Sequence, residues 1–416
     1  MAGTVHILGA GLAGLSAAVR LLEEGADVCV YEAAGHAGGR CRSFHDETLG
    51  KTIDNGNHLV LSGNHAAMQY LNLIDARDRL LSEGRASFPF LDLKTGDRWT
   101  LKPDKGLVPW SIFSKSGRVP GASLASYLKS VGIAGAGPND NVGGRIPTDG
   151  ALWHRFWAPL IVSIMNTRPE EASAVLIWRV LKETFGRGEA ACRPLLAPHG
   201  LGAAFVAPAL AFIEARGGKV LFNARVRRID FADGRVSGLA FASGDEAVGR
   251  EDHVISALPA SVAAGLIPDL QAPDRFSAIV NGHFALPEGT AINQPFLGLV
   301  NGVAEWLFVR DGIVSVTVSA ANDLADEPAE HIAASLWADI TTAFNLGAPS
   351  LTAYRIVKEK RATFEQTPAQ VIKRPSFETT WKNLLLAGDW TDTGLPATIE
   401  GAIRSGFSSA KMILNV

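Results

Sequence analysis

Hydrophobic and polar positions near the start of the chain follow the order strand, helix, strand. Residues 5–8 form a short apolar run that ends at Gly9. Along residues 15–24 the apolar positions recur every three or four residues, a spacing that places them on one face of a helix. Residues 28–31 form a second apolar run, which ends on Glu32. We therefore predict a β-strand, a glycine turn, an α-helix and a second strand.

Comparable runs continue along the chain. Residues 219–242 predict a strand and then a hairpin that closes at the Asp-Gly pair 233–234. Residues 253–260 predict a strand that runs into a proline-terminated loop, and residues 384–387 predict a buried strand. From about residue 397 onward the pattern is that of a helix. This mixture of strands and helices predicts an α/β fold.

Length and charge limit the possible classes of protein. The chain has 416 residues. A single hydrophobic core rarely supports a chain of this length, so we predict two domains. It is 47% hydrophobic and 19% charged and has a formal charge of −3. A chain with this charge is not expected to bind nucleic acid. No uncharged apolar run reaches the ~18 residues of a membrane span. The mean hydropathy of +0.13 and the nine tryptophans predict surplus apolar surface in a core, a pocket or a membrane-facing patch.

The cysteines give no sign of disulfides or of a metal centre. Cys29, Cys41 and Cys192 form no CxxC pair, and three cysteines cannot all be bridged. We expect buried or incidental thiols in a reducing cytoplasm and no metal site.

The segment GAGLAG at residues 9–14 matches the dinucleotide-binding pattern GxGxxG. It follows a predicted strand, opens a predicted helix, and is followed by an acidic residue 18 positions later (14 to 32). The glycines allow the turn and the approach of a pyrophosphate, while the acid accepts a ribose hydroxyl. A second glycine cluster at 132–137 has the wrong final spacing, so we predict a loop there and no separate NAD(P)H site. The predicted cofactor contacts of this first segment are Gly9, Gly11, Leu12, Ala13, Gly14, Glu32 and Ala33.

Two further motifs favour FAD over NAD. Gly38-Gly39-Arg40 brings amides and one positive charge near the phosphates, which suits the larger flavin cofactor, although a surface loop with a solvated arginine is the alternative. The late LAGDW motif places Gly388 and Asp389 at the end of a predicted strand, where ligands gather in open α/β sheets. The carboxylate can accept a ribityl hydroxyl, and the following helix start at Ala397, Thr398 and Ile399 directs its positive dipole at the N1/O2 edge of the flavin. No cysteine stands beside Gly388, so we expect the FAD to be bound non-covalently.

These motifs together resemble a known superfamily. GAGLAG, GGR, LAGDW and PATIEGAIRSG are similar to the motifs of the flavin-containing amine oxidase and carotenoid desaturase superfamily. Within it, DNGNHLVLSGN, FWAPLIVSIMNT and GDWTDTGLPATIEGAIRSG most resemble the squalene-associated branch, the hydroxysqualene dehydroxylases. The resemblance implies a Rossmann-like FAD-binding domain assembled from three segments, 1–75, 196–270 and 366–416. It also implies an α+β substrate-binding domain from residues 76–195 and 271–365.

The resemblance also implies an activity. It is the FAD-dependent reductive dehydroxylation of hydroxysqualene, a C30 isoprenoid alcohol, to squalene, in the synthesis that feeds hopanoids. Electrons come from an external donor. Two other enzyme activities stay open, a carotenoid-type desaturase and an amine oxidase. A third alternative is a prenyl-binding chaperone of the same fold without flavin, such as the inhibitors of Rab GDP dissociation.

The polar segment TIDNGNHLVLSGN at 52–64 raises the question of whether it is a turn or the floor of a site. The resemblance implies that Gly56 and Asn57 bring main chain against the flavin ring, with His58 as the nearest titratable side chain. His58 has a useful charge range near neutrality and is the first candidate for the catalytic acid. A structural hydrogen-bonding role for this histidine is the alternative. The resemblance further implies that Val226 contacts the adenine through its main chain.

The substrate domain carries an almost continuous apolar segment that starts at Leu152. It is either core or the wall of a tunnel for a long hydrocarbon. Residues 105–113, KGLVPWSIF, combine basic and aromatic positions that suit a membrane interface, and a buried loop is the alternative. Residues 129–150 are glycine-rich and predict a loop where this branch is expected to have helix. The predicted substrate contacts are Phe156, Trp157, Leu160, Ile164 and Asn166.

Overall fold

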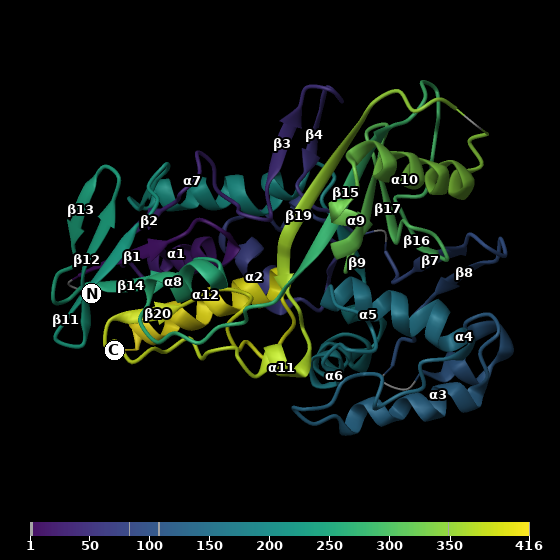
Figure 1. The fold of residues 1–416 in the computed structure, drawn as a ribbon, viewed down its shortest axis with the longest axis horizontal. Coiled ribbons are helices and arrows are strands. Elements are labelled where there is room, and N and C mark those ends of the chain that lie inside the picture. Colours follow the sequence, from purple (N-terminus) through teal and green to yellow (C-terminus); the bar gives the residue numbers. More distant parts are fainter. Residues whose placement is uncertain (1–2, 83, 107–108, 348, 416) are drawn as a thin grey trace.

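The computed structural model describes residues 3–82, 84–106, 109–347 and 349–415. Its first sheet has five parallel strands in the order β10-β2-β1-β14-β20. The chain returns to this sheet from three stretches far apart in sequence, which confirms the Rossmann-like architecture (Figure 1). The strands are β1 (Thr4–Leu8), β2 (Asp27–Tyr31), β10 (Lys219–Leu221), β14 (His253–Ser256) and β20 (Leu384–Leu386).

Helix α1 (Leu12–Glu23) lies at the centre of this part, between α7 (Ala207–Ala215) and α12 (Ile399–Leu414). It begins three residues earlier than predicted, because Gly11 serves directly as its N-cap. The helix is buried on almost every side, since α7, α12 and the sheet surround it. Gly406 of α12 permits the close approach, because a Cβ there would lie 2.2 Å from the carbonyl oxygen of Ala13.

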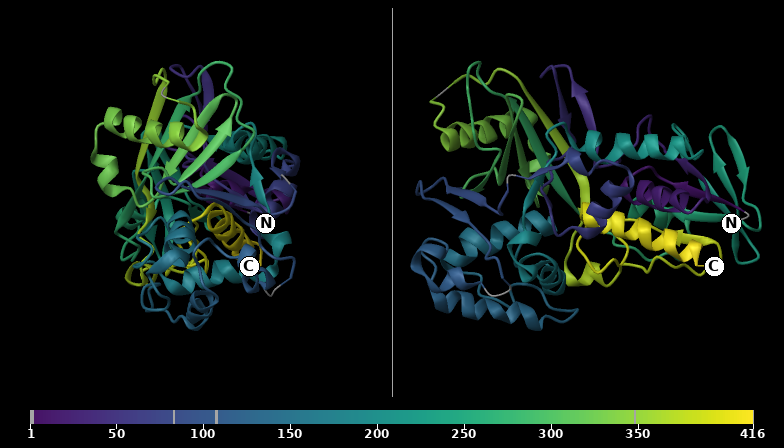
Figure 2. Two further views of the ribbon diagram at one scale, coloured as in Figure 1. Left: turned by 90° about the vertical axis from the view of Figure 1, so that its right-hand side faces the viewer. Right: turned by 180° about the vertical axis from the view of Figure 1, so that it is seen from behind.

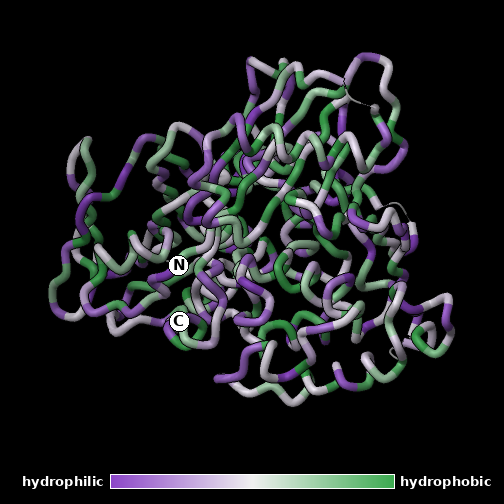
Figure 3. Tube along the Cα trace, turned by 45° about the vertical axis from the view of Figure 1, so that its right-hand side comes forward, coloured by the Kyte–Doolittle hydropathy of each residue, from purple (hydrophilic) through white to green (hydrophobic). Residues whose placement is uncertain are grey.

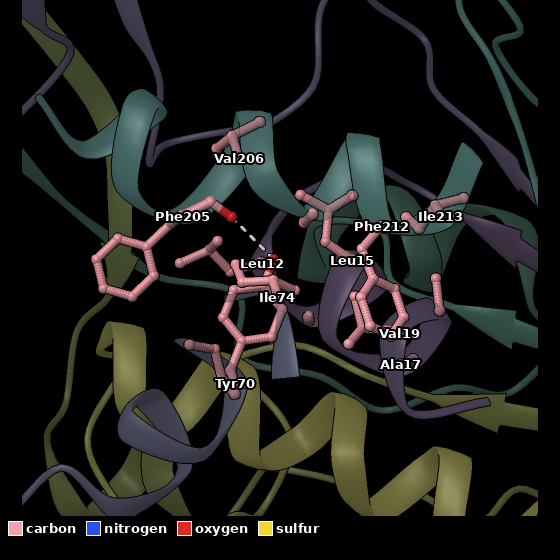
Figure 4. Packing of buried hydrophobic residues seen from close by; sticks show 14 of the residues in the cluster. Leu12, Leu15, Ala17, Val19, Tyr70, Ile74, Phe205, Val206, Phe212 and Ile213 are labelled. Carbon is pink, nitrogen blue, oxygen red and sulfur yellow. Dashed lines mark hydrogen bonds between the residues drawn. The ribbon is translucent and has the colours of Figure 1, made fainter. Parts of the chain in front are cut away.

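A hydrophobic cluster joins α1 to α7 and to α2 (His65–Leu73). Figure 4 shows Leu15 and Val19 of α1 facing Phe212 of α7. In the same view the Tyr70 hydroxyl donates a hydrogen bond to the carbonyl oxygen of Phe205 over 2.8 Å. The base of the cofactor domain is therefore a rigid, close-packed layer.

The second sheet has seven strands in the order β19-β15-β18-β17-β16-β7-β8. All of its pairs are antiparallel except β16 with β7. Helix α10 (Ala329–Phe344) packs on one face through Leu336 and Trp337. The strands are β7 (Phe88–Asp92), β8 (Arg98–Leu101), β15 (Phe276–Ala285), β16 (Phe296–Val300), β17 (Trp306–Arg310), β18 (Ile313–Val318) and β19 (Tyr354–Phe364).

A group of helices from residues 124–183 lies beside the second sheet, at the lower right of Figure 1 and the lower left of the reverse view in Figure 2. These helices have their own apolar cluster around Trp153, Ile161 and Met165. The separate cores support the predicted division into cofactor and substrate domains, whose boundaries stay a prediction. The helices are α3 (Leu124–Ser130), α4 (Gly150–Leu152), α5 (Ala158–Met165) and α6 (Ala174–Glu183).

Smaller elements connect and flank the two sheets. β3 (Ser43–Asp46) pairs with β4 (Lys51–Asp54), and β9 (Pro194–Leu196) lies between β5 (Val60–Leu61) and β6 (Leu81–Ser82). The remaining strands and helices are β11 (Arg228–Ala232), β12 (Arg235–Phe241), β13 (Gly244–Ala247), α8 (Ala260–Leu266), α9 (Asn322–Asp326) and α11 (Pro368–Val371).

The hairpin closes at Asp233 and Gly234 as predicted, with φ angles of 50° and 72°. The predicted strand that runs into a proline-terminated loop is confirmed, since β14 ends at Ser256 and Pro259 precedes α8. The loop predicted at 129–150 is wrong for its first part, since residues 131–135 form a 3₁₀ helix that continues α3.

Burial follows the hydrophobic pattern of the sequence. The hydropathy-coloured tube in Figure 3 shows hydrophilic segments in the projecting hairpins and hydrophobic runs through the interior. The three cysteines are free and buried, as expected. Within the described ranges, no helix combines the length and apolar character needed to cross a bilayer.

Candidate functional site

The turn between β1 and α1 has the geometry of a dinucleotide cradle. Gly9 has a φ of +107°, and a Cβ on Gly14 would lie 1.9 Å from the Gly9 carbonyl oxygen. A Cβ on Gly11, by contrast, would have no described atom within 4 Å. The first and third glycines therefore serve the turn and the packing, while Gly11 leaves open space at the N-terminus of α1. Leu12 and Ala13 form the first turn of that helix, where a phosphate is favoured.

Glu32 stands at the end of β2 and faces the same turn. Its carboxylate accepts hydrogen bonds from the backbone amides of Ala10 and Ala34, each over 2.8 Å. These two bonds fix the carboxylate and leave lone pairs for ribose hydroxyls. Ala33 is exposed between these partners. The predicted roles of Glu32 and its neighbour thus fit the chemistry of a nucleotide.

The segment around Val226 lies beside Glu32. The amide of Ala224 donates to the Glu32 carbonyl oxygen over 2.8 Å, which ties the two loops together. Val226 is buried, and its own amide finds no acceptor within the described ranges. A free backbone donor at this place fits the predicted contact with adenine.

The GGR motif contacts the late GDW motif directly. The Gly38 amide donates to the Ala10 carbonyl oxygen over 2.8 Å, and Gly39 has a φ of +55°. Arg40 forms an ion pair with Asp389 over 2.8 Å, and this carboxylate raises the pKa of the arginine. Sequence reasoning assigned both residues to the cofactor but did not predict that they touch.

The GDW turn is held from within the protein. Gly388 has a φ of +151°, and its amide donates to the Ser405 hydroxyl over 2.8 Å. The buried Arg374 guanidinium donates to the carbonyl oxygens of Asp389 and Leu395. Burial lowers the pKa of Arg374 to about 10, which still leaves it charged at neutral pH. Sequence reasoning missed Arg374, because no local motif marks an arginine that binds a loop 15 residues later (374 to 389).

The start of α12 completes this edge of the cofactor domain. Thr398 is the N-cap and accepts a hydrogen bond from the Gly401 amide over 3.1 Å, with Ile399 as the first helical residue. The Ala397 amide donates to the Gln366 side chain over 2.8 Å. Glu400 accepts from two backbone amides at the start of α2, a second contact that sequence reasoning missed.

The segment 52–64, called the floor segment below, is more than a simple hairpin turn. Strand β4 ends at Asp54, and residues 55–59 then cross to the second sheet. The Asn57 side chain donates to the Thr317 hydroxyl over 3.2 Å, and this hydroxyl donates to Asn281 over 2.9 Å. Asn281 in turn donates to the Asn55 carbonyl oxygen over 3.2 Å. The cofactor-side loop is therefore fastened to β15 and β18 of the substrate domain.

His58 follows Asn57 and lies close to the glycine backbone. Its Nε2 is 3.8 Å from the position of a Cβ on Gly56. The side chain is solvent-accessible. Desolvation by the surrounding groups lowers the pKa of His58 to about 4. The negative charge of Asp54 raises this pKa, and the positive charge of Arg40 lowers it. At neutral pH this imidazole is uncharged.

The predicted substrate residues occupy the helix α5 region in two different ways. Phe156, Leu160 and Ile164 are half-buried. Trp157 is buried, and its Nε1 donates to the Ser130 hydroxyl over 2.9 Å. Asn166 is buried at the end of α5, where its side chain binds backbone and hydroxyl groups of the second sheet. The first three can face a ligand, while the latter two hold the helix in place.

A half-buried apolar wall continues from the floor segment. Leu59 and Leu61 pack against aromatic side chains of the second sheet. The other partly buried members of this wall are Trp99, Leu101, Phe185, Leu196, Trp306 and Phe308. The residues of the candidate site therefore include a dinucleotide cradle, one neutral histidine and a broad cluster of apolar side chains.

Comparisons with known proteins agree with this geometry. The model of the flavin containing amine oxidoreductase family matches residues 12–287 and 309–414. The chain is 45% identical over 412 residues to a hydroxysqualene dehydroxylase of Zymomonas mobilis, with 99% of each chain covered. It is also 45% identical to a hydroxysqualene dehydroxylase of Rhodopseudomonas palustris, covering 100% of this chain and 99% of the relative. An engineered putrescine oxidase shares the fold with a TM-score of 0.71 at 16% identity, over 100% and 99% of the two chains.

The family model covers well over half of the chain, and the relatives match it from end to end. The cradle at Gly11, the fixed carboxylate of Glu32 and the Arg40–Asp389 pair agree with a flavin dinucleotide as cofactor. The chain therefore belongs to the flavin containing amine oxidoreductase family, among the relatives of the hydroxysqualene dehydroxylases.

Proposed function

We propose that this FAD-dependent oxidoreductase removes the hydroxyl group of hydroxysqualene and forms squalene. The observation that carries the proposal is the apolar wall that begins one residue after His58 and continues through Leu59 and Leu61. A C30 hydrocarbon chain requires such a surface, because each methylene that leaves water contributes about 0.8 kcal/mol. Similarity to hydroxysqualene dehydroxylases over the full chain supports the same substrate.

The chain's own residues would bind and orient FAD without a covalent link. Glu32 would accept the ribose hydroxyls, the open side of Gly11 would admit the pyrophosphate, and Asp389 would accept a ribityl hydroxyl. Gly56 and Asn57 would place main chain against the ring. When bound and reduced, FAD supplies a hydride, and the protein supplies position and electrostatics.

His58 is the proposed catalytic residue on the floor segment. Because its pKa is lowered to about 4, the ring is neutral at pH 7, and it would donate an N–H hydrogen bond to the substrate hydroxyl. His58→Ala should retain FAD and yellow colour but slow turnover by roughly 10²–10³, the usual effect of losing one positioned hydrogen-bond donor. Turnover equal to that of the wild type, with unchanged FAD content, would make His58 a structural residue.

We propose that Phe156, Leu160 and Ile164 line the path of the hydrocarbon. They are half-buried on one helical region, whereas Trp157 and Asn166 would support that region from behind. Leu160→Trp should narrow the path and raise KM for hydroxysqualene, while FAD content stays unchanged.

We propose that the protein binds peripherally to the cytoplasmic face of the inner membrane through residues 101–131. Trp110 is 68% exposed and Phe113 is 54% exposed, and their rings lie 5.9 Å apart. The same segment carries five basic residues and one acidic residue, a balance that favours anionic lipids. Of the predicted membrane loop, residues 107–108, including Val108, lie outside the described residues. Loss of co-sedimentation with anionic vesicles in a Trp110→Ser, Phe113→Ser variant would support the contact, and unchanged co-sedimentation would contradict it.

The decisive experiment separates dehydroxylation from desaturation. Chemically reduced holoprotein is incubated with hydroxysqualene, and oxidised holoprotein with phytoene, and both lipid extracts are analysed by mass spectrometry. Squalene from the first incubation and no change in the second would support the proposal. Conversion of phytoene alone would indicate a carotenoid-type desaturase. Electrons in the cell would come from a separate donor, and tight NADPH binding by the isolated chain would contradict this.

A further inference from the structure

Gln366 is a fully buried glutamine two residues after the end of β19, the strand that runs from the second sheet toward α11 and α12 (Figure 1). Its side-chain Nε2 donates to the carbonyl oxygen of Met165 over 2.6 Å. Its side-chain Oε1 accepts from the Ala397 amide over 2.8 Å. Both polar ends of this side chain are therefore bound to main chain, and the two partners lie far apart in the sequence.

The first partner is the end of the helix that carries the proposed substrate contacts. Met165 is the last residue of α5, and Asn166 follows it with a φ of +44°. The last four carbonyl groups of a helix have no partner within the helix, so the Met165 carbonyl oxygen needs one from elsewhere. The Thr167 hydroxyl also donates to this oxygen over 2.9 Å, and it accepts from the Gln366 backbone amide over 2.8 Å. Gln366 therefore binds the end of α5 through its side chain and its backbone.

The second partner is the turn that precedes α12. Ala397 stands directly before Thr398, the N-cap of this helix. The positive end of the α12 dipole lies here, at the proposed contact with the flavin. Two residues before Ala397, the Leu395 carbonyl oxygen accepts from the buried Arg374 guanidinium over 2.7 Å. Two buried side chains, Arg374 and Gln366, thus hold the turn on which the flavin contact depends.

The two contacts of the Gln366 side chain require an amide. The Met165 carbonyl oxygen only accepts and the Ala397 amide only donates, so the group between them must offer one donor and one acceptor. A glutamine amide offers both on one planar group. Because the interior around it is close-packed, a shift of α5 relative to the start of α12 stretches one of these bonds. The side chain therefore links the positions of the two elements.

We propose that Gln366 is a positioning residue that sets the substrate helix relative to the flavin-side turn, an inference that rests on the proposed function. Helix α5 carries Leu160 and Ile164, two of the proposed contacts with the hydrocarbon. The start of α12 carries the proposed contact with the flavin. Reacting atoms must approach to about 3–3.5 Å, and a misplacement of about 1 Å can cost about 10² in rate. A side chain that links both elements therefore affects turnover without touching substrate.

The test compares two variants of the holoenzyme, Gln366→Met and Gln370→Met. Methionine has a similar length but offers no amide. Gln370 on α11 is the matched control, because it is also buried, accepts from the Asp274 amide over 3.0 Å and donates to the Asp274 carboxylate over 2.8 Å. Both variants should retain FAD and lower the melting temperature. Only Gln366→Met should lower kcat, by roughly 10–10², and shift the visible absorption band of the bound flavin, while KM changes little.

Equal kcat values in the two methionine variants would overturn the proposal, because a purely structural role does not distinguish them. Gln366→Glu serves if Gln366→Met fails to fold, since it keeps an oxygen for the Ala397 amide and removes only the donor to Met165. It should lower kcat and leave the flavin spectrum unchanged, and wild-type kcat would overturn the proposal. Failure of the wild-type enzyme to form squalene would instead overturn the proposed function. In that case the flavin spectrum of Gln366→Met, measured against Gln370→Met, still tests the link, and an unshifted band would overturn it.

Discussion

Replacing Glu32 by alanine should weaken FAD binding by a measurable and limited amount. The carboxylate is held by two backbone amides, those of Ala10 and Ala34, each over 2.8 Å, so it is already aimed before the cofactor arrives. Hydrogen bonds that involve a charged group contribute about 1.5–3 kcal/mol each, but at a half-buried site water replaces part of the loss. We therefore expect Glu32→Ala to cost about 1–3 kcal/mol, which corresponds to a roughly 5- to 150-fold increase in the Kd for FAD.

The assay is a titration of apoprotein with FAD, followed by the quenching of flavin fluorescence, with melting temperatures measured in parallel. Glu32→Gln keeps one acceptor oxygen and should lose less affinity than alanine. Glu24→Ala is the matched control, because Glu24 pairs with Arg20 on the surface of the protein, away from the cradle. A Kd for Glu32→Ala equal to that of this control would refute the assignment of Glu32 to the ribose.

Three further outcomes follow from the same geometry. In a double-mutant cycle of Arg40→Ala and Asp389→Ala, FAD affinity should show a coupling energy of about 0.5–3 kcal/mol, and additive losses would mean that the ion pair is unimportant for binding. Gly388→Ala should lower the melting temperature and the flavin content, because φ is +151° and a Cβ would lie 2.4 Å from a neighbouring indole nitrogen. Burial raises the pKa of Asp92, but hydrogen bonds, including one from Arg155, outweigh this and hold it below the usual range. The stabilisation that the ionised Asp92 gives to the folded protein is therefore complete above the pKa of an unfolded aspartate, about 3.9. This stabilisation is lost as the pH falls through the lower pKa that Asp92 has in the folded protein. Asp92→Asn should accordingly reduce the unfolding free energy more at pH 7 than at pH 2, and an equal loss at both would contradict the linkage.

The sequence could predict the parts of the fold that local pattern decides. The strand, turn and helix from Thr4 to Glu23 depend on near neighbours and on glycines at fixed spacing, and they were confirmed apart from the start of α1. The hairpin at Asp233 and Gly234 needs only two residues that tolerate positive φ. The 3₁₀ helix at 131–135 was missed, because its glycines indicate a loop and only the contacts of the finished fold override them.

The contacts that assemble the site could not be predicted, because each joins residues far apart in the chain. Arg374 binds the GDW turn, and Asn281 binds the floor segment, yet neither stands in a recognisable motif. A polar side chain in the middle of a strand usually faces solvent, so nothing local distinguishes the buried Asn281 from an exposed one. Only the pairing of β15 with β18 places it beside Thr317 and the floor segment.

The two halves of the site depend on each other for their chemistry. The cofactor domain alone supplies a cradle and a neutral histidine, which can orient a hydroxyl group but holds no extra proton at pH 7. The second sheet supplies the apolar side chains of Trp306 and Phe308, which pack in one cluster with Leu59 and Leu61 of the floor segment. The Asn57–Thr317 hydrogen bond connects these halves, because it ties the segment that follows β4 to β18. The position of His58, the residue after Asn57, therefore depends on the second sheet as well as on the cofactor domain.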